Sequence, residues 1–331
     1  MEFPDPHIIP PQVSHTHTAI LLHGRGSDGP EFAEEFFSSV TSRKQNLVSC
    51  LPAWRWVFPT SRDRWSTTFQ EEECSWFDAY SLTDIHARQD LQIDGLRESI
   101  SHVLDLLENE IRLLGGQSNR VYLGGISQGM ATALWALFCA TRRVHGQLGG
   151  FVGFCGWFPF ARQVEEFETA NSPSTSGEKT EIQQRQVLDF FHDTIAHPET
   201  SPADAVNNAS ILSTSVFLSH GTDDPWVSVE LGRQASRVVR QIMGHVEWSE
   251  FTGAEGDGHW IKEPEGFDRV LHFFEKCIQS YMQDGYQVSD ISTCFNRNHW
   301  HMYFYQMIVV SIYSQTSPRR FPRMPITSHS R

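Results

Sequence analysis

Hydrophobic and polar positions follow two patterns along most of the chain. Short apolar runs that stop at glycine-bearing loops predict buried strands at residues 18–22, within 47–59, and at 120–123, 149–154, 215–218 and 246–251. Longer stretches repeat apolar residues at helical spacing and predict helices over residues 31–40, 90–114, 131–142, 230–243 and 264–282. Strands that alternate with such helices are typical of an α/β fold with a mostly parallel central sheet and helices on both faces.

The same patterns indicate the domain organisation. We expect one domain over residues 15–283, because its glycine-bearing loops fall at the carboxyl ends of strands, where such sheets bind ligands. Residues 1–14 are interpreted as an N-terminal extension. Polar, turn-rich segments indicate an insertion at about 161–210 with a short helix inside it. Residues 284–331 show no clean period and are interpreted as a peripheral or disordered tail.

Charge and cysteine content argue against several classes of protein. The formal net charge of -14 at pH 7 disfavours a nucleic-acid surface or adhesion to anionic lipid, because both need clustered lysine and arginine. We find no secretory signal and no apolar run long enough to span a bilayer. The six cysteines are scattered without a Cys-x-x-Cys pair. This favours free thiols in the cytoplasm over disulfides or a zinc site, and the oligomeric state stays unknown.

The stretch GGISQGM, residues 124–130, places a serine between a predicted strand and a predicted helix. Gly-x-Ser-x-Gly at such a turn is typical of a nucleophile elbow, in which the glycines let the chain fold back and the hydroxyl stands above the sheet edge. A tight turn that needs only small residues is the alternative. The strand before Ser127 and the helix after it favour the nucleophile.

A serine nucleophile needs a base and an acid that orients this base. In the α/β-hydrolase order they follow the serine as Asp or Glu and then His. The segment HGTDDPWV follows the strand at 215–218 and offers Asp223 and Asp224. His259, in GDGHW, lies between the last strand and the final helix, where the base belongs. The other later histidines precede a strand, lie in the final helix, or lie in the tail: His245, His272, His299 and His301.

The segment His23-Gly-Arg-Gly26 follows the first strand and completes the set. A backbone N–H there and the N–H after the nucleophile form the oxyanion hole of such enzymes. We assign these donors to the amides of Arg25 and Gln128. The segment has neither the lysine and Ser/Thr of a P-loop nor the spacing of a dinucleotide fingerprint, so a phosphate-binding loop is disfavoured.

Six motifs, in the order LLHGRGSDG, SWFD, GGISQGM, CGWFP, HGTDDPWV and GDGHW, resemble the acyl-protein thioesterase/lysophospholipase–carboxylesterase family of α/β-hydrolases. The resemblance covers about residues 15–280, apart from the insertion. It implies Ser127 as nucleophile, His259 as base and Asp224 as orienting acid, because the family places the acid directly before the position of Pro225. It also implies a cytosolic serine hydrolase that cleaves carboxylic esters and thioesters, including fatty acyl chains on proteins and lysophospholipids, without metal or organic cofactor.

Substrate binding is the least determined part of this interpretation. Trp76 in SWFD and Trp157 in CGWFP are candidates for lining the site. Met130 stands where the family commonly has a small residue, Ser228 stands where proline is common, and the segment after CGWFP is longer than usual. The apolar face of the helix in this insertion forms either a lid over an acyl groove or a packing surface for the fold.

Two other functions remain open at this stage. A carboxylesterase of the same fold would cleave small esters and have no protein substrate. A hydrolase-fold binding protein would have no turnover, but such proteins usually lack a member of the triad, and all three candidate residues are present here.

Overall fold

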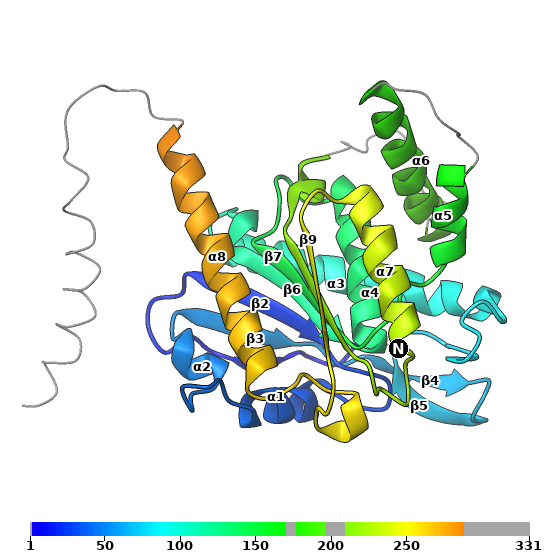
Figure 1. Ribbon diagram of the computed structural model, residues 1–331, viewed down its shortest axis with the longest axis horizontal. Coiled ribbons are helices and arrows are strands. Elements are labelled where there is room, and N and C mark those ends of the chain that lie inside the picture. Colours follow the sequence, from blue (N-terminus) through cyan, green and yellow to red (C-terminus); the bar gives the residue numbers. More distant parts are fainter. Residues whose placement is uncertain (1, 170–176, 196–208, 288–331) are drawn as a thin grey trace, which may run out of the picture. The chain divides into compact units, whose positions relative to one another are not determined.

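The structure is a computed structural model that describes residues 2–169, 177–195 and 209–287. Its centre is a seven-stranded sheet of order β1-β3-β2-β6-β7-β8-β9 (Figure 1). The strands are β1 (His7–Ile9), β2 (His17–Leu22), β3 (Trp54–Phe58), β6 (Val121–Ile126), β7 (Gly150–Phe154), β8 (Val216–Gly221) and β9 (Val246–Phe251). All pairs are parallel except β1 with β3. The predicted mostly parallel sheet is therefore confirmed.

Helices cover both faces of this sheet, as predicted (Figure 1). Alternate strand residues point to opposite faces, so Leu123 joins one buried cluster and its neighbour Tyr122 joins the other. The first cluster includes residues of α3 (Gln92–Leu113), α4 (Gln128–Cys139) and α7 (Val229–Ile242). The second includes residues of α1 (Gly29–Ser38), the short α2 (Leu47–Cys50) and α8 (Glu265–Gln287). Met1–Gln283 form one compact unit, and a second unit begins at Asp284.

The N-terminal segment needs a correction. His7–Ile9, which the sequence placed in an extension before the domain, form strand β1 at the edge of the central sheet. His7 pairs with Phe58 and Ile9 with Trp56, in antiparallel register. A strand of three residues beside Pro10 and Pro11 is too short to show a period of two, and its partner β3 is about fifty residues away in the chain. The sequence pattern therefore could not reveal it.

A two-stranded hairpin is separate from the central sheet. Its strands are β4 (Arg62–Ser66) and β5 (Glu71–Ser75), paired antiparallel from Arg62 with Ser75 to Ser66 with Glu71. Charged residues occupy most positions of both strands, so no apolar run indicates them.

The insertion contains two helices, α5 (Ala161–Thr169) and α6 (Gly177–Ile195) (Figure 1). The sequence predicted a single helix near the second of them. Residues 170–176 and 196–208 of the insertion, and residues 288–331 of the tail with His299 and His301, lie outside the part of the chain that the structure describes. Within the described part, no helix is long and apolar enough to cross a membrane.

Candidate active site

The backbone at Ser127 has the shape of a nucleophile elbow. Ser127 joins β6 to α4 with φ 56° and ψ -123°, a backbone conformation that residues other than glycine rarely adopt. A Cβ at Gly125 would lie 2.7 Å from the Leu22 carbonyl oxygen, and one at Gly129 only 2.2 Å from the same atom. Both glycines are therefore required, because β2 passes directly beside the turn.

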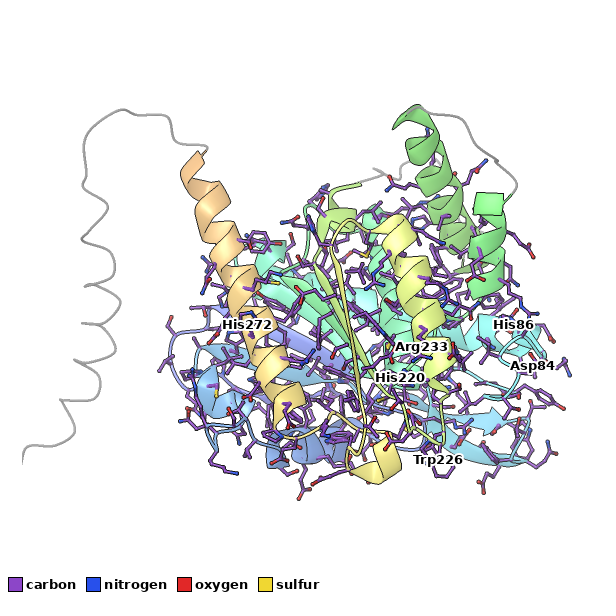
Figure 2. The ribbon with its side chains drawn as sticks, viewed as in Figure 1. Asp84, His86, His220, Trp226, Arg233 and His272 are labelled. Carbon is purple, nitrogen blue, oxygen red and sulfur yellow. The ribbon has the colours of Figure 1, made fainter. Side chains whose placement is uncertain are left out.

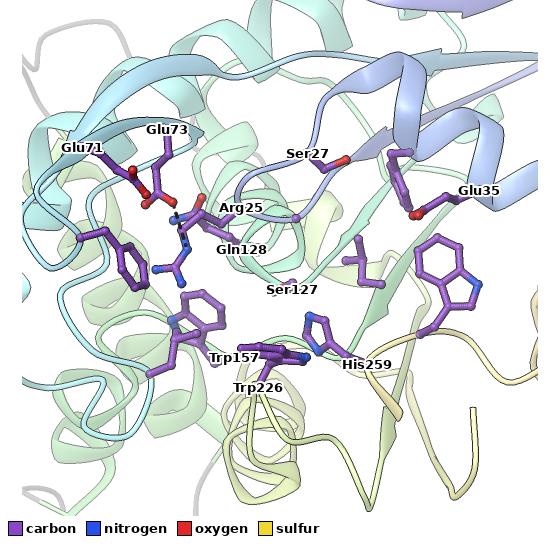
Figure 3. Close-up of a pocket in the computed structure, with 16 residues that line it drawn as sticks. Arg25, Ser27, Glu35, Glu71, Glu73, Ser127, Gln128, Trp157, Trp226 and His259 are labelled. Atoms are coloured by element: carbon purple, nitrogen blue, oxygen red, sulfur yellow. Dashed lines mark ion pairs between the residues drawn. The ribbon is translucent and has the colours of Figure 1, made fainter. Parts of the chain in front are cut away.

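The elbow opens into a cavity of about 520 Å³ (Figure 3). Ser127 and His259 both line it, as do Arg25, Gln128 and Trp157. In Figure 3, Ser127 lies between the imidazole of His259 on one side and Arg25 with Gln128 on the other. Five of the seven predicted site residues therefore meet around one cavity, although they come from four separate segments of the chain.

Asp224 orients the imidazole of His259. The distance from Asp224 Oδ2 to His259 Nδ1 is 2.6 Å, and Asp224 Oδ1 accepts the backbone N–H groups of Trp226 and Val227, each at 2.9 Å. Burial alone raises the pKa of Asp224, but hydrogen bonds from His220, His259 and the Val227 amide outweigh burial and hold this pKa below its ordinary value. Because Nδ1–H donates to a carboxylate, His259 has its free lone pair on Nε2.

The neighbouring aspartate has a different task. Asp223 Oδ2 accepts the backbone N–H of Gly253 at 2.8 Å, and its carboxyl group packs against Gly258. A Cβ at Gly258 would come within 2.9 Å of Asp223 Oδ1. Asp223 therefore anchors the loop that carries His259, whereas only Asp224 contacts the imidazole.

His23 holds the loop that supplies the first candidate oxyanion donor. Its ring is fully buried, and Nε2 accepts the N–H of Ser61 at 3.0 Å, so Nδ1–H donates to the Gly24 carbonyl at 2.6 Å. Burial lowers the pKa of His23 to about 4, and the ring is neutral at physiological pH. Gly24 lies against the nucleophile: a Cβ there would be 3.4 Å from Ser127 Cβ. The Arg25 amide follows directly.

The side chain of Gln128 fixes the second candidate donor. Gln128 Oε1 accepts the N–H of Trp76 at 2.9 Å, and Nε2 donates to the Phe77 carbonyl at 2.7 Å. Trp76 in turn donates its indole N–H to the His23 carbonyl at 2.9 Å. These contacts connect the elbow, the SWFD segment and the loop after β2 into one hydrogen-bonded unit.

The expectation that Trp76 lines the site is wrong. Its side chain has no exposed surface and does not border the cavity. The reason is that the indole N–H has a backbone acceptor at His23, so the ring is buried beside the His23 imidazole, with ring centroids 5.0 Å apart. Trp76 therefore supports the site from behind instead of contacting a ligand.

Other apolar side chains of the cavity were not identified from the sequence. Trp157 borders the cavity as expected, together with Leu82, Phe69 and Trp226. Phe69 lies between the strands of the hairpin, and Trp226 is 65% exposed. Only Trp226 had a sequence signal, because it follows the Asp-Pro pair of the acid loop. Folding of the hairpin against the site could not be read from a local pattern.

One group among the described residues has the donor atoms of a metal site: Cys155, Asp224 and His259, whose ligand atoms lie within 4.8 Å of one another. Burial raises the pKa of the Cys155 thiol, so the thiol is protonated at neutral pH. The carboxylate and Nδ1–H are already hydrogen-bonded to each other. Two members of this group are therefore the Asp224–His259 pair already described. The expected absence of metal and cofactor stays a prediction.

A parallel sheet, a serine elbow after β6 and an Asp–His pair on two later loops define an α/β-hydrolase. Residues 4–201 match the model of the phospholipase/carboxylesterase family. Because this match covers more than half of the chain, the protein belongs to that family of carboxylic-ester hydrolases. The family and the hydrolase class predicted from the sequence are confirmed.

Individual relatives agree with this assignment. The chain is 26% identical over 248 residues to acyl-protein thioesterase 1 of Yarrowia lipolytica, covering 74% of this chain and 86% of that protein. It is 25% identical over 274 residues to acyl-protein thioesterase 1 of Gibberella zeae, covering 82% and 94%. Among solved structures, acyl-protein thioesterase 2 of Zea mays matches with a TM-score of 0.57 at 23% identity, covering 83% of this chain and all of that one. This likeness shows a shared fold.

Proposed function

We propose that the protein is a serine hydrolase that removes fatty acyl groups from protein cysteines and cleaves lysophospholipid esters, with Ser127, His259 and Asp224 as its triad. The observation that carries the proposal is the Asp224–His259 hydrogen bond of 2.6 Å beside a cavity that Ser127 also lines. The thioesterase names of the relatives support the choice of substrate. The free state of the five described cysteines supports a cytoplasmic location.

The chemistry follows from the placement of protons. The lone pair on His259 Nε2 takes the proton of Ser127 Oγ as this oxygen attacks the acyl carbon, and the same imidazole then protonates the departing thiolate or alkoxide. Asp224 is ionised, and so it stabilises the imidazolium that forms in each half of the reaction. Water repeats the attack on the acyl-enzyme and releases the fatty acid.

The amides of Arg25 and Gln128 stabilise the oxyanion in this scheme. Both residues border the cavity next to Ser127, and both amides are fixed by contacts behind them rather than by substrate. Donors that are held in place before the reaction need no reorganisation, and each contributes about 3–4 kcal/mol in comparable sites.

The lining of the cavity is compatible with a long acyl chain and also with a small ester. Phe69, Trp157 and Trp226 give it aromatic surface on which an alkyl chain can be buried. Three carboxylates, those of Glu35, Glu71 and Glu73, also border it. These polar groups suit a short, polar ester, although Glu73 is paired with Arg25 at 3.6 Å, so a small-ester carboxylesterase is the second candidate.

The test is a paired kinetic comparison on a palmitoylated peptide and an acetyl aryl ester. We expect the wild-type protein to react rapidly with a fluorophosphonate probe and to have the higher kcat/KM on the palmitoyl thioester. Ser127→Ala should fold normally, lose labelling and lose activity by roughly three orders of magnitude or more. Turnover retained by pure Ser127→Ala would refute the triad. A preference for the acetyl ester would instead support the small-ester carboxylesterase.

A further inference from the structure

A second histidine contacts the acid of the site. His220 is in β8, next to the loop that carries Asp224 (Figure 2). Its imidazole is fully buried. His220 Nε2 lies 2.8 Å from the Val227 carbonyl oxygen and 3.3 Å from Asp224 Oδ2. Both neighbouring oxygens are acceptors, so Nε2 carries the proton; its N–H donates to the Val227 carbonyl and faces Asp224 Oδ2 as a second, longer contact.

This contact completes the hydrogen bonding of the carboxylate. Asp224 Oδ1 accepts two backbone N–H groups, and Oδ2 is shared between His259 at 2.6 Å and His220 at 3.3 Å. With donors on both oxygens, the carboxylate cannot rotate without losing a partner. The two imidazoles also compete for the same oxygen.

The buried site of the His220 ring has a glycine on one side and leaves one ring nitrogen without a hydrogen bond. In α7, Gly232 lies directly against it, and a Cβ at this position would be 2.3 Å from His220 Nδ1. Among the residues that the structure describes, this buried Nδ1 has no hydrogen-bond partner. A buried polar atom without a partner is unfavourable. The ring therefore gains its stabilisation through Nε2, at the carboxylate and the Val227 carbonyl.

We propose that His220 is a positioning residue for the reaction: it fixes the Asp224 carboxylate and moderates its support of the His259 imidazolium. This inference rests on the proposed triad. A donor on Oδ2 withdraws charge from the oxygen that stabilises the imidazolium. Without that donor, His259 is protonated more readily, so the acid limb of the kcat/KM profile moves to higher pH.

The other charged and titratable groups near His220 each have another partner or a fixed protonation state. Glu250 in β9 is paired with Arg233 of α7 at 2.7 Å, so the charges of these two neighbours offset each other. Cys155 at the end of β7 is a protonated thiol, and Asp223 points to the Gly253 amide. Of these groups, His259 is the one that gains and loses a proton in the proposed reaction while it is bonded to Asp224 Oδ2.

The experiment compares four variants with the wild-type protein on the acetyl aryl ester from pH 5 to 9. His220→Phe removes the donor and fills the space, and His220→Gln keeps an N–H donor. Gly232→Ala leaves His220 in place but displaces its ring. His192→Phe is the matched control, because His192 is a buried histidine of α6 that bonds Thr141 and does not border the cavity.

We expect His220→Phe to lower kcat by about tenfold at unchanged KM, the low end of the loss seen when a hydrogen-bond partner behind a metal-bound histidine is removed. Its acid limb should move to higher pH. Gly232→Ala should show the same shift in weaker form, His220→Gln should restore most of kcat, and His192→Phe should leave both quantities at wild-type values.

A wild-type kcat and acid limb in folded His220→Phe or Gly232→Ala would overturn the inference. Equal losses in His220→Phe and His220→Gln with an unmoved acid limb would also overturn it, because they indicate a purely structural role. If His220→Phe does not fold, Gly232→Ala and His220→Gln decide the outcome. Failure of the triad itself is distinguishable, because it appears as activity and probe labelling retained by Ser127→Ala.

Discussion

At the residue scale, two adjacent aspartates on one loop separate two tasks. Successive side chains of an extended or turning backbone point in different directions, so the carboxyl groups of Asp223 and Asp224 have no common partner. Asp223 holds the backbone of Gly253, and Asp224 holds the ring of His259. Substitution of each residue by asparagine therefore changes a different contact.

We expect Asp224→Asn to lower kcat/KM on an aryl ester by about 10⁴-fold, because an amide cannot stabilise the imidazolium and favours the wrong tautomer. Asp223→Asn is the matched control. It keeps an oxygen that can accept the Gly253 N–H, so we expect a loss of only a few-fold. Steady-state kinetics of both variants would check this. A larger loss in Asp223→Asn would mean that the acid is assigned to the wrong residue.

At the element scale, α6 decides between the two roles open to the insertion. Its buried face lies on α4: the rings of Phe191 and Phe138 stack with centroids 4.9 Å apart, and Trp135 is 4.8 Å from Phe191. No described residue of α6 borders the cavity. The helix thus packs on the fold, and this argues against the lid over an acyl groove.

Accordingly, Phe191→Ala should lower the free energy of unfolding by about 3–5 kcal/mol, the usual cost of emptying a fully buried aromatic site. Phe190, which is only half-buried, provides the control, and Phe190→Ala should cost less. Urea denaturation measures the loss of stability. KM values for a palmitoyl thioester and an acetyl ester should keep their wild-type ratio in both variants; a rise confined to the palmitoyl substrate would restore the lid.

At the scale of the whole molecule, burial of histidines links folding to pH. Burial lowers the pKa of His23 to about 4 and that of His192 to about 3, from an ordinary value of 6.5. Between these values and about 6.5 the unfolded chain binds protons that the folded protein excludes. The stability is therefore fully present above about pH 6.5 and falls as the pH is lowered towards 3–4.

Each such histidine steepens this loss by up to about 1.4 kcal/mol per pH unit. We expect His192→Gln, which keeps a polar partner for Thr141, to reduce the slope of unfolding free energy against pH between 4 and 6. Urea denaturation at several pH values measures the slope. An unchanged slope would show that His192 takes up its proton without unfolding.

The sequence by itself determined most of the helices and strands and the order of the candidate catalytic residues along the chain. Short apolar runs and periods of 3.6 residues are local properties, so the central strands and the long helices were recognised from neighbouring positions. The glycines around Ser127 were also a local signal, because they stand two positions before and after the serine in one short motif. The structure adds the reason for them, since the close approach of β2 permits no side chain there. The order of the serine, the two aspartates and His259 along the chain was likewise visible without a structure.

Only the tertiary structure decided contacts between distant segments. The pairing of β1 with β3, the burial of Trp76 against His23 and the packing of α6 on α4 each join residues tens of positions apart. The same holds for the placement of Phe69 at the cavity. His220 and Asp224 are only four positions apart, but the conformation of the loop between them, which brings the imidazole onto the carboxylate, was likewise not visible in the pattern. Such contacts depend on how the elements pack in three dimensions, and a local pattern of apolar and polar residues carries no record of which surfaces will meet.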